Sequence, residues 1–449
     1  MEKTDASGKT LSNRLDNLPV KGWHWMMLSL LLLLMMVENY NQVSIAMTMP
    51  VIIRAWKLSP ANIGVLLSAS SLGLLIGAVL FGFITDILGR KKSLILTTVL
   101  FSAFVGLGAF AQDFNTLYWL RVGAGLGLGG FIPVGQAYVS EYAPLRVRGR
   151  FLGIFSIGNG IGYCLTVLAS MFLNTASGDG WRITFALGAI GLLIIPFVIF
   201  YLPESVRWLV GRGKIDEAVK IVENIEKKTI GSVSVPTAEA LDIAKQSAAQ
   251  QSAKGKTSMA TFFKGDLLKA TLLASVLMLA INYTFYGFIQ WMPTFLTTNM
   301  GYELGKGYWF TLIAALVGTG TPGLAVGYLC DKIGRRWTMG LMMGIYAVSG
   351  FIFLALTGWS ILLLYWFSSA MSSVLYIYVP ELFPTRLRGS ALGVTGGIGR
   401  VAGFIAPVLI GLTVAAWGLT GVITVNAVIL VVTIALIFIF GIETMAVKA

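Results

Sequence analysis

Two stretches decide the architecture of this chain: GFITDILGRKK at residues 82–92 and GYLCDKIGRRW at residues 327–337. A second pair, SEYAPLRVRGR at 140–150 and PELFPTRLRGS at 380–390, lies at nearly the same offset, about 240–245 residues. A constant offset over two motifs indicates that the second half of the chain repeats the first. Such parallel repeats are typical of membrane transporters whose binding site lies where the repeats meet.

The composition around these motifs is that of a membrane protein. Hydrophobic residues make up 56% of the 449 residues and charged residues only 12%, whereas soluble domains carry about 25% charged residues. About twelve apolar runs reach the roughly 20 residues that a membrane-spanning helix needs, and none shows the period of two of a barrel strand. They lie near residues 25–50, 61–85, 93–112, 116–139, 151–173, 182–202, 269–297, 307–330, 337–357, 361–383, 390–414 and 418–442. We therefore predict an all-α membrane protein with twelve transmembrane helices in two pseudo-symmetric six-helix bundles.

The placement of the charges sets the expected orientation and argues against nucleic acid as a partner. The net charge is +13, and the basic residues cluster after the second, fourth, eighth and tenth runs, whereas the alternate loops hold few. An excess of Lys and Arg on one side places that side in the cytoplasm, here together with both termini. The first run is too long for a signal-peptide core, so we expect it to be retained as a helix in the cell (inner) membrane.

The same pattern divides the chain into five expected parts. They are a cytoplasmic tail at 1–24, a first six-helix bundle at 25–202, a cytoplasmic linker at 203–265, a second bundle at 266–442 and a tail at 443–449. Within the linker, KIDEAVKIVENIEKK carries one apolar stripe, which predicts a short amphipathic helix lying under the bundle.

Metal, disulfide and enzyme chemistry are not expected. The two cysteines, Cys164 and Cys330, both fall in apolar runs, and the only histidine, His24, lies at the mouth of the first run. These residues offer no disulfide framework and no metal-ligand cluster, and we see no set of nucleophile and base. We predict no metal and no cofactor, and a proton relay would have to use carboxylates.

The repeated motifs resemble the loop signature of the major facilitator superfamily, and LPESVRWL (202–209) and PELFPTRLRG (380–389) are similar to its sugar porters. The resemblance covers residues 25–442 and implies two bundles rocking about a central cavity. It also implies a gating role for the charged loop residues, with Glu141 pairing with Arg148 and Glu381 with Arg388; alternatively these charges only fix topology and folding. The gating candidates are Asp86, Arg90, Glu141, Arg148, Glu204, Arg207, Asp331, Arg335, Glu381 and Arg388.

Ionisable residues inside the runs point to the substrate. A charge near the middle of a span costs at least ~2.5–3.5 kcal/mol, so Arg400, in GGIGRVAGFIAP (396–407), needs compensation. It lies about eleven residues, or ~16 Å, into its helix. Alignment of the repeats places Gly160 opposite it, so the shared scaffold does not require an arginine. A guanidinium binds a carboxylate with two hydrogen bonds; the two hypotheses are binding of a substrate anion and a structural pair with Glu38.

Two further charges are candidates for proton coupling. Glu38, in MMVENYNQVS, could take up a proton on one side of the membrane and release it on the other, with ~2.3 kcal/mol per charge per 100 mV available from the potential. Arg121 resembles the basic residue that the superfamily often keeps in its fourth helix, and either a coupling or a structural role is possible. The glycine-rich GAGLGLGG (123–130) after it indicates close helix packing rather than a nucleotide site.

The seventh run, NYTFYGFIQWMPTFL (282–296), distinguishes branches of the superfamily. It lacks the Gln-Gln pair of sugar porters, and its YxxxYGxxxWxP pattern is similar to the organic-acid branch, which includes aromatic acid/proton symporters and nicotinate-type transporters. That branch often carries an Arg in a GRxxG-like stretch, as Gly399, Arg400 and Gly403 do here. One departure is that its Asp-Gly-x-Asp motif is matched by Glu38 to Asn41, so that the second acid is an amide.

We therefore expect a proton-coupled symporter of a small organic anion, an aromatic or pyridine monocarboxylate, that works by alternating access as a monomer. Its partners are the anion, protons and the lipid bilayer. The alternatives are a sugar or polyol symporter and a drug or metabolite exporter; a receptor-like scaffold has no feature in its favour. For each proposed substrate-binding residue, helix packing is the competing role. These residues are Arg400, Tyr40, Asn41, Gln136, Tyr283, Tyr286, Gln290, Trp291 and Tyr376.

Overall fold

A computed structural model describes residues 10–235, 241, 259–356 and 358–444, and these residues contain helices and connecting loops but no strand. The predicted all-α class is therefore confirmed. Parts of the two predicted tails and of the linker at 203–265 lie outside the described residues.

The first six predicted runs correspond to one helical span each. Because proline and small residues are tolerated where neighbouring helices satisfy the backbone, α3, α6 and α9 continue through Pro50, Pro133 and Pro196. The spans are α3 (Gly22–Trp56), α4 (Pro60–Leu88), α5 (Arg90–Gly108), α6 (Phe114–Tyr142), α7 (Arg148–Ala176), and α8 (Gly180–Leu187) continued by α9 (Gly191–Tyr201).

The second six runs are less regular than the first. The seventh combines α13 (Asp266–Asn282), α14 (Gln290–Thr294) and two π-helical segments, η4 (Tyr283–Ile289) and η5 (Phe295–Asn299). The eighth is broken into α15 (Leu304–Gly320) and α16 (Pro322–Ile333), because Pro322 begins the second piece. The last two share one continuous assignment, α19 (Arg388–Phe440), which turns at Gly418 with a φ of 64°. The ninth and tenth runs form α17 (Arg335–Leu356) and α18 (Ile361–Glu381).

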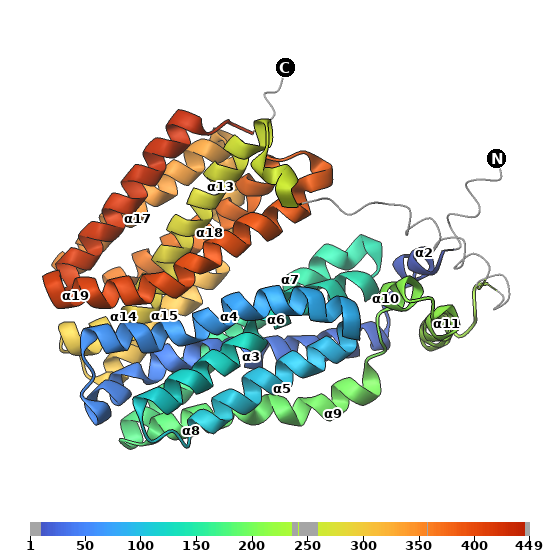
Figure 1. Ribbon diagram of the computed structural model, residues 1–449, viewed down its shortest axis with the longest axis horizontal. Helices are drawn as coiled ribbons and strands as arrows, with labels where there is room; N and C mark the ends of the chain where they lie inside the picture. Colours follow the sequence, from blue (N-terminus) through green and yellow to red (C-terminus); the bar gives the residue numbers. More distant parts are fainter. Residues whose placement is uncertain (1–9, 236–240, 242–258, 357, 445–449) are drawn as a thin grey trace.

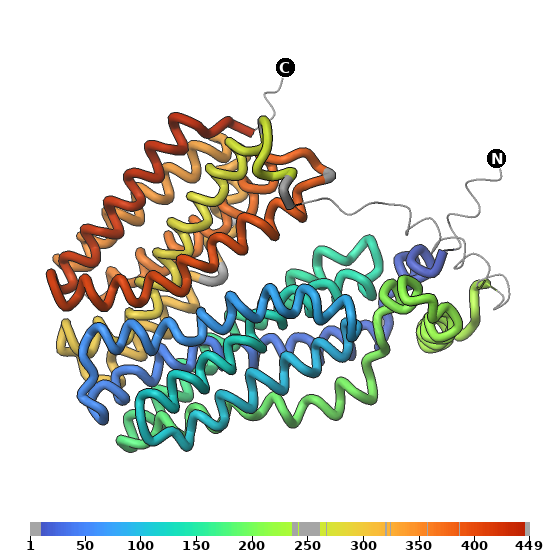
Figure 2. The backbone as a smooth tube through the Cα atoms, in the orientation of Figure 1, coloured from blue at the N-terminus to red at the C-terminus, as the bar shows by residue number. Residues whose placement is uncertain are grey.

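The helices form two groups that touch at one end and diverge at the other (Figure 1). The tube in Figure 2 shows the first group, α3 to α9, beside the second, α13 to α19, with the contact near α4, α14 and α15. We call the end where the groups diverge the basic end and the end where they touch the closed end. The basic end holds the loops at 89–92, 143–150, 334–336 and 382–388; the closed end holds the loops at 57–59, 109–113, 177–179 and 300–303.

Glycines allow the closest helix contacts, as predicted for GAGLGLGG. A Cβ added to Gly73 of α4 would lie 2.0 Å from the carbonyl oxygen of Val122 on α6. Between the two groups, a Cβ on Gly64 would lie 2.4 Å from the carbonyl oxygen of Pro407, and one on Gly411 would lie 2.4 Å from that of Pro60. The closed end is therefore held by direct backbone contact between α4 and α19, which only small residues permit.

Three short helices lie at the basic end, against the end of the first group (Figure 1). The predicted amphipathic linker helix is α11 (Ile215–Ile230), which follows α10 (Val206–Gly211) and buries Val219, Val222 and Ile225. The sequence did not indicate the third, α2 (Leu11–Asp16), which docks on α11. Its Leu11 and Leu15 are buried, and its Arg14 donates two hydrogen bonds to the buried Glu226 of α11, at 2.9 and 2.6 Å.

The docking of α2 should depend on pH through Glu226. Burial opposes ionisation of this carboxyl, but hydrogen bonds from Arg14 and Ser234 outweigh it and lower the pKa of Glu226 below its ordinary value. A lowered pKa in the folded state gives stability that is complete above the unfolded pKa of ~4.3 and is lost as the pH falls through the folded value. The protection factors of the α2 amides in hydrogen exchange should therefore fall as the pH falls below ~4.

Removing the partner of Glu226 should abolish that pH dependence. Breaking a buried ion pair costs about 3–5 kcal/mol, so Arg14→Ala should lower the α2 protection factors by more than ~100-fold at neutral pH, to the values of wild type at acid pH. Lys227→Ala removes a charge from the same helix without touching the pair and should change little. Protected α2 amides in Arg14→Ala would show that the apolar contacts alone hold the helix.

Candidate functional site

The GRxxG stretch lies where α19 packs against the seventh span. A Cβ on Gly399 would lie 2.8 Å from Nδ2 of Asn282, and one on Gly403 would lie 3.2 Å from the ring of Tyr286. The two glycines, one immediately before Arg400 and one three residues after it, thus let the seventh span approach α19 closely. Tyr286 belongs to the π-helical η4, a geometry that occurs often at functional sites.

A small cavity of about 60 Å³ lies between the two groups at the level of η4. The first group contributes polar and aromatic side chains from α3 and α7, and the second contributes the seventh span. The lining residues are Asn39, Gln42, Val43, Ala46, Met47, Tyr163, Phe285, Tyr286, Ile289 and Gln290. Two residues predicted to bind substrate, Tyr286 and Gln290, therefore lie at the predicted interface between the repeats.

Tyr286 connects this cavity to the charged candidates. Its hydroxyl lies beside Gln42 and within electrostatic reach of Tyr376, Arg400 and Glu38. Tyr376, on α18, is 64% exposed. The structure thus brings together four predicted residues from α3, η4, α18 and α19 around one aromatic hydroxyl.

Arg400 has neither an ion pair nor a hydrogen bond to any residue that the structure describes, although it is half-buried. Its position, twelve residues after the start of α19, is about 18 Å along the helix from the basic end. The predicted alternative of a structural pair with Glu38 is not formed. An arginine that lacks a partner inside a span carries a cost that a bound anion would remove.

Glu38 is fully buried on α3, and neither of its carboxyl oxygens has a hydrogen-bond partner in the described part of the chain. An unpaired carboxylate is very costly in such a place, whereas the protonated acid is tolerated. This environment suits a group that binds and releases a proton as the surroundings open and close.

Arg121, in contrast, is fully buried and well bonded. It donates to Ser70 Oγ at 2.9 Å, to Ser44 Oγ at 3.2 Å and to the carbonyl oxygen of Asn41 at 2.9 Å, and its guanidinium lies 5.7 Å from the centre of the Phe185 ring. These contacts join α3, α4, α6 and α8. They favour the structural one of its two predicted roles.

Four other substrate candidates lie away from the central cavity. The Tyr40 hydroxyl donates to the carbonyl oxygen of Thr184 at 2.9 Å, and Asn41 Nδ2 donates to that of Gly188 at 3.0 Å. Trp291 Nε1 donates to Pro407 at 3.2 Å within the second group. Tyr283 faces a separate apolar groove between α13 and α19. These contacts correspond to the competing role of helix packing.

Gln136 is exposed on α6 and lies outside the lining of the central cavity. Conversely, the sequence argument missed Asn39, Gln42 and Tyr163, which line it. A signal was present: Asn39, Gln42, Val43 and Ala46 follow the spacing of one helix face, whereas Tyr40 and Asn41 point elsewhere. Asn39 Nδ2 also donates to Asn159 Oδ1 at 3.1 Å, which ties α3 to α7.

At the basic end, one glutamate in each group holds the motif loop. Glu204 accepts the backbone N–H of Lys91 at 2.9 Å, and Glu443 accepts those of Arg335 and Arg336 at 2.8 and 3.1 Å. The glycine before each helix has a φ of 93° and leaves no room for a Cβ beside the carboxylate. A carboxylate at a helix N-terminus is stabilised by the free N–H groups and the dipole. Glu443 was not among the predicted residues.

The predicted pairs Glu141–Arg148 and Glu381–Arg388 are wrong for this conformation. Glu141 instead accepts hydrogen bonds from Ser205 Oγ at 2.6 Å and from the backbone N–H of Arg207 at 2.8 Å. Glu381 pairs with Arg335 at 3.1 Å.

The basic partners of those two pairs are used elsewhere. Arg148 pairs with Asp16, the last residue of α2, and Arg388 donates to the carbonyl oxygen of Phe383 at 3.4 Å. The motif acids pair locally, Asp86 with Arg90 at 3.8 Å and Asp331 with Arg335 at 3.3 Å. None of these ion pairs joins the first group to the second, in keeping with the separation of the groups at this end.

Comparison with known proteins identifies the family. The family model described as "Sugar (and other) transporter" matches residues 20–448. The chain belongs to this transporter family. It is therefore a multi-pass membrane transporter and not an enzyme, and the predicted resemblance to the major facilitator superfamily is confirmed.

Individual members of the transporter family resemble this chain over most of their length. The niacin transporter NiaP of Acinetobacter baylyi is 31% identical over 441 residues, which is 97% of each chain. The benzoate transport protein of the same organism is 27% identical over 418 residues, covering 89% of this chain and 86% of the relative. Among solved structures, a D-xylose-proton symporter superposes with a TM-score of 0.72 at 18% identity, covering 94% of this transporter and 99% of that chain.

Proposed function

We propose that this transporter carries a small organic anion, an aromatic or pyridine monocarboxylate, together with a proton. The observation that carries the proposal is Arg400, half-buried deep in a span without a partner among the described residues. A carboxylate supplies two acceptors in the plane of the guanidinium, and the adjacent Tyr286 supplies a hydroxyl and an aromatic face. The names of two relatives, a niacin transporter and a benzoate transport protein, support the same class of substrate.

Transport in this proposal follows alternating access. The basic end faces the cytoplasm, because the Lys and Arg residues gather there, and both termini lie on that side of the inner membrane. The two groups are separated at the basic end and joined at the closed end (Figure 1), so this conformation is open to the cytoplasm. Both halves of the site come from one chain, which therefore works as a monomer.

The carboxylate requirement is tested with matched ligands. Purified transporter is heated with benzoate against benzamide, nicotinate against nicotinamide, and glucose. A ligand that binds the folded state raises the apparent melting temperature by mass action. We expect stabilisation by one or both acids, none by the amides and none by glucose.

The competing function is transport of a neutral sugar, favoured by the LPESVRWL segment and by the breadth of the family. Stabilisation by glucose, or an equal response to an acid and its amide, would support that function and leave Arg400 without a role in recognition. The comparison of acid with amide is decisive because the two ligands share the ring and differ only in charge and in one donor group.

A further inference from the structure

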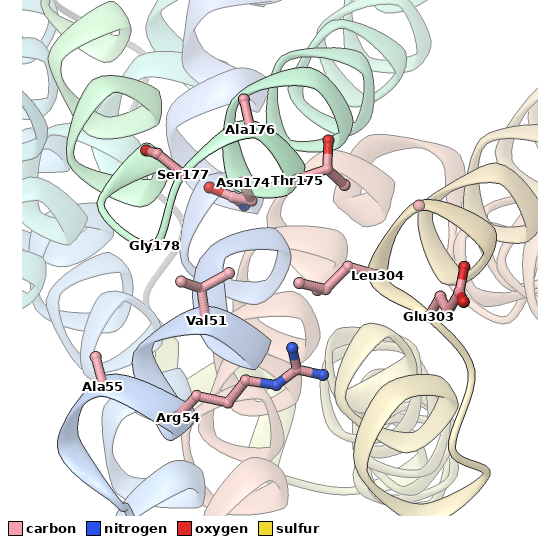
Figure 3. A pocket seen from close by; sticks show the side chains of 11 residues that line it. Val51, Arg54, Ala55, Asn174, Thr175, Ala176, Ser177, Gly178, Glu303 and Leu304 are labelled. Carbon is pink, nitrogen blue, oxygen red and sulfur yellow. The ribbon is translucent and has the colours of Figure 1, made fainter.

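A second, larger cavity lies between the two groups on the far side of the closed contacts. Its volume is about 880 Å³, and it opens at the closed end. Figure 3 shows Arg54 of α3 reaching into it beneath Leu304 of α15, with Asn174 and Thr175 of α7 on the opposite wall. The lining residues are Val51, Arg54, Ala55, Asn174, Thr175, Ala176, Ser177, Gly178, Glu303, Leu304 and Gly305.

A thin layer of hydrogen bonds separates this outer cavity from the central one. Asn174 Nδ2 donates to the Tyr308 hydroxyl at 2.9 Å, and that hydroxyl donates to the carbonyl oxygen of Met47. Thus α3, α7 and α15 are joined across the two groups. Asn174 is buried, and its Oδ1 accepts no hydrogen bond from the described residues. The layer can therefore be opened by breaking few bonds.

One face of α3 leads through this layer from the central cavity to the outer one. Asn39, Val43 and Met47 line the central cavity, and Val51 and Arg54 line the outer one. These positions recur every three or four residues, so they share one side of the helix. Arg54 lies seven residues beyond Met47, or ~10 Å further out along the axis. The outer cavity is thus in line with the central one.

Arg54 is the charge suited to an anion in this cavity. It is exposed, and it forms no ion pair or hydrogen bond with any described residue. Glu303, the one acid in the lining, turns its carboxylate away from the guanidinium (Figure 3). The backbone N–H groups at the start of α15, at Leu304 and Gly305, add a partial positive charge to the same wall.

We propose that the outer cavity is a capture site, in which Arg54 holds the carboxylate of the arriving anion before the layer of Asn174 and Tyr308 opens. This inference rests on the proposed organic-anion function. A cleft that carries one sign of charge raises the local concentration of an oppositely charged ligand and its rate of association. The volume suits a flat monocarboxylate, since pockets for small molecules span ~300–1,000 Å³.

A lock formed by Arg54 and Glu303 is the competing role for the same residues. Such a lock should be closed when the closed end is joined, as it is here. The carboxylate of Glu303 is instead turned away from Arg54, and the two side chains make no ion pair in the described structure. Ligand capture therefore accounts better for an arginine that faces an open cavity.

The test is uptake of radiolabelled nicotinate and benzoate into proteoliposomes, followed from the closed-end face at low and high ionic strength. For Arg54→Gln we expect KM to rise roughly three- to tenfold with kcat within about twofold, because only capture is weakened. The KM of the wild type should increase with salt, and that of the variant should depend on salt less. Thermal stabilisation by the acids at saturation should remain, since Arg400 is untouched.

Two matched variants isolate the site. Lys57→Gln removes the same charge three residues further along but outside the cavity lining, and should change KM less than twofold. Glu303→Gln removes the opposing charge and should leave KM equal or lower. An unchanged KM in Arg54→Gln, while wild type still requires a carboxylate, would overturn the capture site alone. A fall in kcat at constant KM would assign Arg54 to the gate instead. If the wild-type transporter neither binds nor takes up any of the acids, both the organic-anion function and the capture site would be overturned.

Discussion

Arg400→Gln should abolish stabilisation by carboxylate ligands and reduce kcat/KM for their uptake by roughly 100-fold or more. Truncating one partner of a buried, hydrogen-bonded charge pair costs about 2–5 kcal/mol, and 1.4 kcal/mol corresponds to a factor of ten. Glutamine keeps one donor group, but it is shorter and removes the charge and the second parallel hydrogen bond. Arg400→Lys should retain an intermediate affinity, because an ammonium keeps the charge but not the planar pair of donors.

The melting temperature of the ligand-free protein distinguishes a binding role of Arg400 from a structural one. Arg400 has no ion pair or hydrogen bond with any described residue, so its charge costs stability in the empty transporter. We therefore expect the melting temperature of ligand-free Arg400→Gln to equal or exceed that of wild type. Replacing a structural arginine should instead lower the melting temperature. Arg121→Gln should do so, because the Arg121 side chain bonds to α3 and α4.

The control for Arg400→Gln is Arg150→Gln. Arg150 is exposed near the start of α7, and it allows the same substitution outside the membrane interior. It should leave both ligand stabilisation and uptake near wild type. Loss of stability in ligand-free Arg400→Gln, together with normal ligand response of the remaining folded protein, would contradict a binding role.

The fold could be predicted because it follows from patterns that are visible in the amino-acid sequence itself. The repeated motifs, the apolar runs and the small residues at 123–130 each have a direct physical consequence, and the helices lie where those runs lie. The sequence did not indicate where the helices of the second group are interrupted or joined. The eighth run is divided at Pro322, and the last two runs share one helix assignment because the turn at Gly418 is short.

The central site was harder to predict because it depends on which way each helix faces. Arg400 and Tyr286 were found because a charge and an aromatic in unusual contexts stand out, and the glycines beside Arg400 bring them together. On α3, however, Tyr40 and Asn41 seemed as suitable as Asn39 and Gln42, and only packing against α8 and α7 separates the two pairs. The π-helical η4 further shifts the phase of the seventh span, which a regular 3.6-residue period does not anticipate.

Charge partners at the basic end could not be predicted for a related reason. Glu141 and Arg148 are near in sequence, but the linker supplies Ser205 to Glu141, and the end of α2 supplies Asp16 to Arg148. Both partners come from segments whose packing no local pattern reveals. A conformational cycle also exchanges such partners, so one sequence corresponds to more than one set of pairs.

Glu38→Gln should eliminate accumulation driven by a pH gradient while leaving exchange of substrate across the membrane intact. One pH unit supplies about 1.4 kcal/mol per proton, enough for tenfold accumulation. Proteoliposomes with a two-unit inward gradient should therefore accumulate the acid up to ~100-fold with wild type and show no pH-driven accumulation with Glu38→Gln. Counterflow with substrate on both sides should persist, because glutamine imitates the protonated carboxyl that crosses with the anion.

The membrane potential reports how many protons accompany each anion. Glu38 is followed by an amide at Asn41, where the resembling motif has a second acid, and Asn41 Nδ2 is bonded to Gly188. One titrating acid allows one proton, and a proton moving with a monoanion transfers no net charge. Clamping the potential should therefore leave accumulation by wild type unchanged, whereas a second proton would add ~2.3 kcal/mol per 100 mV.

Glu217→Gln is the control for a change of acid to amide, since Glu217 is exposed on α11 and pairs only with Lys214. Full pH-driven accumulation by Glu38→Gln would assign proton coupling to another group. Loss of both accumulation and counterflow would mean that Glu38 is needed for the conformational change itself. Because its carboxyl oxygens have no described partner, a neutral side chain should satisfy that site at least as well as the acid.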